Sequence, residues 1–236
     1  MLADADVERA LVITAHPDDV DFGAAGTVAL WSDAGVKVTY CVITDGDAGG
    51  FDLAVPRDRI GNIRRDEQRA AAGEVGVCDV QFLGYPDGRL EVSFELRREL
   101  SRVIREVRPQ RVICQSPQRH MVRIAASHPD HLAAGEAAMC AVYPDARNPF
   151  AFPEIAELEA WSVAETWVMA SERANRYVDI TDVFERKMTA LRAHASQHPD
   201  AAALDPLLRG WNGGNAVAGG LPEGRLAEAF WVMETA

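Results

Sequence analysis

Short apolar runs alternate with longer segments of helical periodicity along the first part of the chain. The runs are ALVITA (10–15), VKVTYCVIT (36–44), CDVQFLG (78–84) and RVICQS (111–116). Apolar residues three or four positions apart follow them over 23–35, 60–76 and 94–107, and a further helix opens at SHPDH (127–131). Strands that are apolar throughout and alternate with helices are typical of a parallel sheet covered on both faces.

The pattern weakens beyond Pro144, where a proline-rich stretch occupies 143–154. Two further strands are predicted at 164–169 and 176–180, and a helix is predicted over 183–197. The C-terminal region is rich in glycine and ends in EGRLAEAFWVM, which we interpret as a helix.

We expect a single domain over 1–236, because no internal repeat or linker divides the chain. The predicted fold class is α/β, a Rossmann-like three-layer sandwich with a mostly parallel sheet in 1–143. A smaller C-terminal portion, 144–236, is expected to complete the pocket. With 48% hydrophobic residues, a chain of this length can bury a substantial core.

Charge and hydropathy restrict the partners of the protein. The chain has 24 Lys and Arg against 36 Asp and Glu, so its net charge of −12 argues against nucleic acid and anionic membranes. Its apolar runs are shorter than the roughly 20 residues of a membrane helix. Acidic residues in MLADADVER stand where a secretory signal would be basic and then apolar. We therefore expect a cytoplasmic protein that acts on a small molecule.

The stretch VITAHPDDVDFGAAGT (12–27) places a histidine and several acids at the end of the first strand. Ligands of open α/β sheets bind outside the carboxyl ends of the strands. His16 and Asp19 are three residues apart there, and SHPDH supplies His131 after the fourth strand. Two histidines and one aspartate suit zinc and leave a coordination position for water. Iron or cobalt could replace zinc at such a site.

A simpler explanation of one His-Pro-Asp stretch is helix capping, since Asp is a common N-cap and Pro is common in the first turn. Two such stretches at the same edge of the sheet favour a metal site. Asp18 cannot easily bind a metal in the same direction as Asp19, and we interpret it as the base that deprotonates the attacking water. His128 would stabilise an oxyanion or protonate the leaving amine.

Here AHPDD (15–19) and HPDH (128–131) resemble the PIG-L/LmbE-like zinc-dependent de-N-acetylases. This family includes deacetylases of GlcNAc-phosphatidylinositol and of the mycothiol precursor GlcNAc-inositol, and relatives that act on glycopeptide antibiotics. The resemblance implies zinc at His16, Asp19 and His131, with Asp18 as the base and His128 as its electrostatic partner. RRDE matches the family R-x-x-E with Arg64 and Glu67.

YPDG carries Asp87 where the family places a sugar-contacting aspartate. The resemblance therefore implies that Arg64 and Asp87 contact the substrate. A later K-x-x-A-L-x-x-H-x-S-Q pattern extends from Lys187 to Gln197 and implies a substrate contact or a supporting role for His194. Many family members read HPDDE, whereas Val20 and Asp21 follow here. Asp21 could support the site, but we interpret it as a helix cap.

Together, the residues and the resemblance predict a zinc-dependent hydrolase that removes an N-acyl group, expected to be N-acetyl, from an amino sugar. The alternatives are an amidase that acts on a mycothiol conjugate or a natural-product intermediate, and a non-catalytic binding protein with a metal. A structural metal site would be closed by four protein ligands. Members of the family are often oligomeric, so the chain is a possible homo-oligomer.

Other histidines and arginines carry weaker signals. His120 and His198 lack a partner motif and are predicted to lie at the surface. The arginines of 94–107 alternate with acids and predict a solvated helix face. GAAGT lacks the spacing of a dinucleotide fingerprint, so no dinucleotide cofactor is expected.

Overall fold

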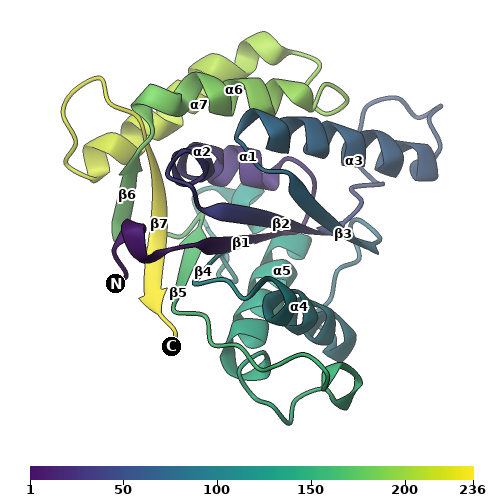
Figure 1. Ribbon diagram of the computed structural model, residues 1–236. Coiled ribbons are helices and arrows are strands. Elements are labelled where there is room, and N and C mark those ends of the chain that lie inside the picture. Colours follow the sequence, from purple (N-terminus) through teal and green to yellow (C-terminus); the bar gives the residue numbers. More distant parts are fainter.

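The computed structural model describes residues 1–236, except for the side chain of residue 201. One seven-stranded sheet forms its centre, in the order β3-β2-β1-β4-β5-β7-β6 (Figure 1). The strands are β1 Arg9–Thr14, β2 Lys37–Thr44, β3 Asp79–Tyr85, β4 Arg111–Gln115, β5 Glu165–Met169, β6 Arg176–Asp179 and β7 Ala227–Glu234. The first five strands are parallel, and β7 runs antiparallel to β5 and β6. The predicted mostly parallel α/β sheet is confirmed.

Seven α-helices cover the two faces of this sheet. They are α1 Asp19–Gly23, α2 Ala25–Asp33, α3 Arg57–Glu74, α4 Phe94–Val107, α5 Pro129–Cys140, α6 Phe184–Ala193 and α7 Ala201–Ala218. Figure 1 shows α4 and α5 on one side of the sheet and the other helices on the opposite side. None of these helices, as far as the structure describes them, has the length and apolar character needed to cross a bilayer.

Two apolar cores, one on each face, explain why the first four strands read as continuous apolar runs. In β1, Ala10 and Val12 join the core under α2, α3 and α6, while Leu11 and Ile13 join the core under α4 and α5. Successive side chains of a strand point to opposite faces, so both sets must be apolar when both faces are covered.

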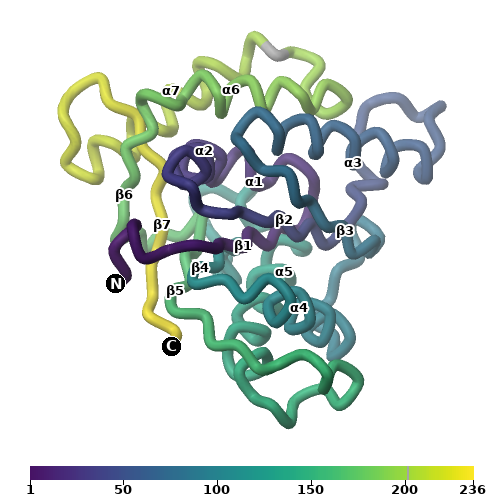
Figure 2. Tube along the Cα trace, in the orientation of Figure 1, coloured from purple at the N-terminus to yellow at the C-terminus, as the bar shows by residue number. Residues whose placement is uncertain are grey.

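The C-terminal region differs from the sequence prediction. The predicted helix over 223–233 is wrong, because 227–234 form β7 between β5 and β6. Phe230 and Val232 of β7 are buried in one core, and the alternate residues Trp231 and Met233 pack against the other. The glycine-rich segment before it forms α7. The two termini lie close together beside β7 (Figure 2), where the Met1 ammonium pairs with Glu234.

The helix boundaries agree in part with the predictions. The helix expected over 23–35 begins at Asp19 and is interrupted at Ala24, and the helix expected over 183–197 ends at Ala193. Helix α4 spans the predicted 94–107, with the Ser93 hydroxyl accepting the Leu96 N–H at its start.

The prediction of a solvated arginine face on α4 is wrong for Arg105. Arg105 is 2% exposed and donates to five backbone carbonyls between residues 145 and 158. Arg97 makes two hydrogen bonds of 2.8 Å to Asp145. These arginines therefore fix the proline-rich segment against α4 and are not left in solvent.

Candidate active site

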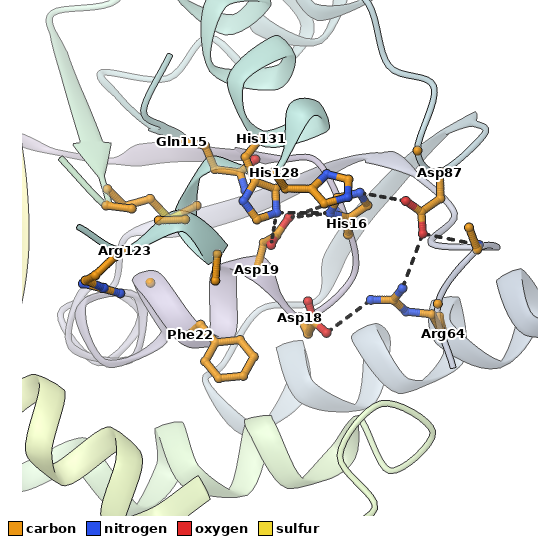
Figure 3. Close-up of a pocket in the computed structure, with 18 of the residues that line it drawn as sticks. His16, Asp18, Asp19, Phe22, Arg64, Asp87, Gln115, Arg123, His128 and His131 are labelled. Atoms are coloured by element: carbon orange, nitrogen blue, oxygen red, sulfur yellow. Dashed lines mark hydrogen bonds and ion pairs between the residues drawn. The ribbon is translucent and has the colours of Figure 1, made fainter. Parts of the chain in front are cut away.

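A cavity of about 560 Å³ lies at the carboxyl ends of the parallel strands (Figure 3). Its walls come from the loops after the first five strands, from α3 and from α7. All five residues predicted for metal binding and catalysis line it, together with the predicted substrate contacts Arg64 and Asp87. Met169, Ala170 and Trp211 from the second half of the chain complete the lining. The structure thus brings the two histidine-containing motifs together at one site.

His16, Asp19 and His131 bring four possible ligand atoms together, namely one nitrogen of each histidine and both oxygens of Asp19. The distance is 3.4 Å from His16 Nδ1 to Asp19 Oδ2, and 3.0 Å from His131 Nε2 to Asp19 Oδ1. The two imidazole nitrogens, His16 Nδ1 and His131 Nε2, are 3.3 Å apart. A tetrahedral metal with bonds of 2.0–2.1 Å separates its ligand atoms by about 3.3 Å. The donor set and its spacing therefore fit a zinc-like divalent ion.

Two other groups of side chains could also hold a metal. One combines His16 and His131 with His128, and the other combines His16 with Asp87 and Asp130. The carboxylates of the second group lie on the Nε2 side of His16, at 3.0 and 3.1 Å. Asp130 already accepts the N–H groups of Gly88 and Leu90.

Asp130 is better placed to orient His16 than to bind a metal. A carboxylate that accepts Nε2–H fixes the neutral tautomer and directs the Nδ1 lone pair toward Asp19 and His131. This arrangement favours the Nδ1 side of His16 as the metal position. Asp130 was not among the residues predicted for the site, although it lies inside the HPDH motif.

The electrostatics of the site also suit a cation. Burial alone would lower the pKa of His16, but hydrogen bonds to three carboxylates raise it to about 12. Despite burial, which would raise it, the pKa of Asp19 lies well below its usual value because His131 and His16 are adjacent. The carboxylates therefore remain ionised, and the site attracts positive charge as either protons or a metal ion.

Asp18 has a different environment from Asp19. Its backbone is in the left-handed region, with φ of 90°, a conformation that costs free energy for a residue with a side chain. Gln68 Oε1 accepts the Asp18 N–H at 2.8 Å, and Arg64 Nη2 lies 3.2 Å from Asp18 Oδ2. Burial raises the pKa of Asp18 to about 6, although the Arg64 charge opposes this shift. A carboxylate with a pKa near neutrality suits a general base.

Asp21 is not the helix cap that we predicted. It is fully buried, and its Oδ2 accepts hydrogen bonds from Gln68 Nε2 at 2.9 Å and from His194 Nε2 at 2.8 Å. His194 is also fully buried, so it faces Asp21 and not the cavity. Gln68 connects this pair to the backbone of Asp18 and was not predicted from the sequence. Its only signal was its position directly after Glu67 in the R-x-x-E motif.

The prediction that His198 and His120 lie at the surface is wrong. The His198 side chain is 18% exposed, its Nε2 lies 3.8 Å from Asp18 Oδ2, and its ring packs edge-on against Phe22. Burial lowers the pKa of His198, so a neutral imidazole stands beside the proposed base. The His120 side chain is 14% exposed and pairs with Glu172 at 3.2 Å.

The K-x-x-A-L-x-x-H-x-S-Q pattern, from Lys187 to Gln197, holds α6 and the segment after it against the site. Glu67 accepts hydrogen bonds from the Ser196 N–H at 2.8 Å and from the Ser196 hydroxyl at 2.7 Å. Lys187 is buried and donates to Glu228 and to the Phe22 carbonyl, both at 2.6 Å. These contacts hold α6 against α3 and the end of α1, the elements that carry Arg64 and the aspartates.

The fold and site define an α/β protein with a His/Asp-lined cavity suited to a divalent metal. Residues 11–142 match the family model of PIG-L, described as GlcNAc-PI de-N-acetylase. The chain belongs to this family. Diacetylchitobiose deacetylase of Thermococcus kodakarensis is 34% identical over 199 residues, which cover 83% of this chain and 72% of the relative.

Two further relatives agree with this assignment. A probable N-acetyl-alpha-D-glucosaminyl L-malate deacetylase 2 of Bacillus cereus is 34% identical over 195 residues, 79% of this chain and 82% of the relative. The N,N'-diacetylchitobiose deacetylase structure from Pyrococcus horikoshii, solved with its inhibitor, has a TM-score of 0.89 and 32% identity. That match covers 97% of this chain and 85% of the other, and confirms the fold.

Proposed function

We propose that this protein is a metal-dependent hydrolase that removes an N-acetyl group from an amino sugar or a sugar-containing small molecule. The observation that carries the proposal is the cluster of His16, Asp19 and His131 at the cavity, with Asp18 beside it. The named relatives are deacetylases of N-acetylated sugars, which supports the same reaction here. Zinc is the expected metal, and iron or cobalt could take its place.

A divalent metal held by His16, Asp19 and His131 would polarise the amide carbonyl and acidify water. Asp18 accepts the proton of the attacking water, because its carboxylate opens on the cavity and its pKa is poised near neutrality. Arg64 keeps part of the Asp18 population ionised at lower pH, since its guanidinium opposes the effect of burial.

His128 is placed to stabilise the oxyanion of the tetrahedral intermediate. Its Nδ1 accepts the Asp130 N–H at 3.1 Å, so a neutral His128 carries its proton on Nε2. Burial, together with the neighbouring His16 and His131, lowers the pKa of His128 and favours that neutral form. The Nε2–H group can then donate to the oxyanion, and the proton that Asp18 took from the water passes to the leaving amine, so that acetate and the free amine form.

The test combines metal analysis with amine release from N-acetylglucosamine and N,N'-diacetylchitobiose. Wild type should contain about one divalent metal per chain and release amine, and His131→Ala should lose both. Asp18→Asn should keep its metal and lose about 10²–10⁴-fold in kcat. Asp182→Asn is the matched control, because the Asp182 side chain is 84% exposed.

Three other results would each contradict one part of the proposal: the mechanism, the substrate class or the catalytic role. Wild type that binds no divalent metal under any reconstitution would refute the hydrolase mechanism. Metal without turnover of any amino sugar would refute the substrate class and direct attention to other amides, such as mycothiol conjugates. A fourth protein ligand in a metal-loaded crystal structure would favour the non-catalytic alternative.

A further inference from the structure

Arg123 lies in the wall of the cavity without a protein counter-ion. Its guanidinium stacks on the Trp211 ring, 4.1 Å from the ring centroid. Among the described residues, no Asp or Glu oxygen lies within salt-bridge distance of it. Arg64, the other arginine in the lining, is already paired with Asp18. The cavity therefore contains one positive charge that the chain itself does not neutralise.

Several arginines of this acidic chain make no salt bridge, and Arg123 is exposed like many of them, but Arg123 also lines the cavity. Most other cavity charges are compensated by their neighbours. Burial lowers the pKa of Arg123, so its environment already removes part of the water around the charge. An anion on a bound ligand would compensate this desolvation with charge-assisted hydrogen bonds.

The position of Arg123 in the cavity indicates that it faces the C1 substituent of a bound amino sugar. Figure 3 shows Arg123 at one end of the site and Arg64 with Asp87 at the other, with the histidines between them. In a 2-acetamido sugar, C1 and C3 lie on opposite sides of the carbon that bears the amide. If the sugar hydroxyls lie at Arg64 and Asp87 and the amide lies at the histidines, C1 and its substituent point toward Arg123.

A second, smaller hollow of about 40 Å³ adjoins the cavity at this end and shares Arg123 and Trp211 with it. Its wall includes Asn212, which is 1% exposed and whose Oδ1 has no hydrogen-bond partner. A buried amide without a partner costs free energy unless a ligand or water satisfies it. The hollow therefore suits a polar group of a ligand at Asn212, next to a charged group of the same ligand at Arg123.

We propose that Arg123 binds a carboxylate on the C1 substituent of the substrate and thereby selects amino-sugar glycosides with an acidic aglycone. This inference rests on the proposed deacetylase function. One face of the guanidinium is covered by Trp211, which leaves its edge for a two-point contact with a carboxylate. A single cation matches one carboxylate better than a doubly charged phosphate, because Asp18, Asp19 and Asp87 also face the cavity.

The experiment compares two substrates that differ by one carboxylate: the methyl and carboxymethyl glycosides of N-acetylglucosamine, as the same anomer. Both are tested with wild type, Arg123→Gln and Arg173→Gln. Arg173 is the matched control, because it is exposed and also stacks over a tryptophan, Trp231, at 5.4 Å, but does not line the cavity.

Wild type should have the higher kcat/KM for the carboxymethyl glycoside. Arg123→Gln should lower that value about tenfold, mainly through KM, and change the value for the methyl glycoside less than about twofold. Arg173→Gln should behave as wild type on both substrates.

The inference is wrong if wild type has equal kcat/KM for the two glycosides, or if Arg123→Gln lowers both equally. In either case deacetylation of the methyl glycoside leaves the proposed function intact. If folded, metal-loaded wild type deacetylates N-acetylglucosamine or N,N'-diacetylchitobiose but neither glycoside, only this inference is wrong. If it deacetylates none of these sugars, the proposed function is refuted, and this inference with it.

Discussion

Removing the charge of Arg64 should move the acidic limb of the pH profile of kcat/KM to higher pH. The Arg64 guanidinium lies 3.2 Å from Asp18 Oδ2, and both side chains are mostly buried, at 5% and 15% exposure. At an effective dielectric constant of about 20, two unit charges at this distance interact by about 5 kcal/mol. The delocalised guanidinium charge and cavity water reduce this value, and an adjacent arginine typically lowers a carboxyl pKa by ~1–3 units.

The sign follows from the proposed role of Asp18 as a base. Asp18 must be ionised to accept a proton, so kcat/KM falls as the pH drops through its pKa. The pKa of Asp18 is about 6 because burial raises it more than Arg64 lowers it. Arg64→Gln removes the largest lowering effect and leaves only the smaller ones of His194 and His16, so the limb should move up by about 1–3 pH units. A bound metal lowers the pKa in both proteins, so the difference between them persists.

The assay is amine release between pH 5 and pH 9, with metal content measured at each pH. Metal analysis separates protonation of Asp18 from loss of the ion when the histidines are protonated. Arg64→Lys is the matched control, since it keeps the positive charge and should leave the limb near the wild-type position even if KM rises. A limb that stays in place in Arg64→Gln, or moves equally in both variants, would refute the electrostatic reasoning.

Two further predictions concern stability. Lys187→Met should lower the free energy of unfolding by about 3–5 kcal/mol in urea titrations, because it leaves the buried Glu228 carboxylate without its cation. Lys37→Met, at an exposed position, should change it by less than about 0.5 kcal/mol, and equal losses would contradict the role of the pair. Gly135→Ala should lower both the melting temperature and metal content, because its Cβ would lie 2.5 Å from a backbone oxygen of β4 and displace the helix that carries His131. Gly214→Ala in α7 meets no atom within 4 Å and should instead stabilise by about 0.5–1 kcal/mol, so a loss of stability there would refute the steric argument.

The fold was predictable where local pattern and tertiary burial agree. Strands of a parallel sheet that are buried on both faces are apolar throughout, and β1, β2 and β4 show this directly in the sequence. Strand β7 could not be predicted in this way. Its residues Ala227 and Glu228 favour helices locally, but pairing with β5 and β6 decides the conformation, and those partners are distant in sequence.

The site residues that follow strand ends were also predictable, whereas those that depend on helix packing were not. His16, Asp19 and His131 each follow a strand end, and parallel strand ends meet at one edge of the sheet. Gln68 and His198 escaped prediction because they reach the site from α3 and from the segment after α6. Their positions depend on how α6 packs against α3, which includes the Glu67–Ser196 contact.

The three acids of HPDDVD show most clearly what composition alone could not reveal. Asp18, Asp19 and Asp21 differ little as residue types, yet one faces Arg64, one faces two histidines and one is buried against His194. The left-handed conformation of Asp18 starts α1 at Asp19 and turns the adjacent carboxylates in different directions. Gln68 stabilises that turn through the Asp18 N–H and also holds Asp21. The separation of the proposed base from the proposed metal ligand therefore depends on one backbone conformation and on a helix far along the chain.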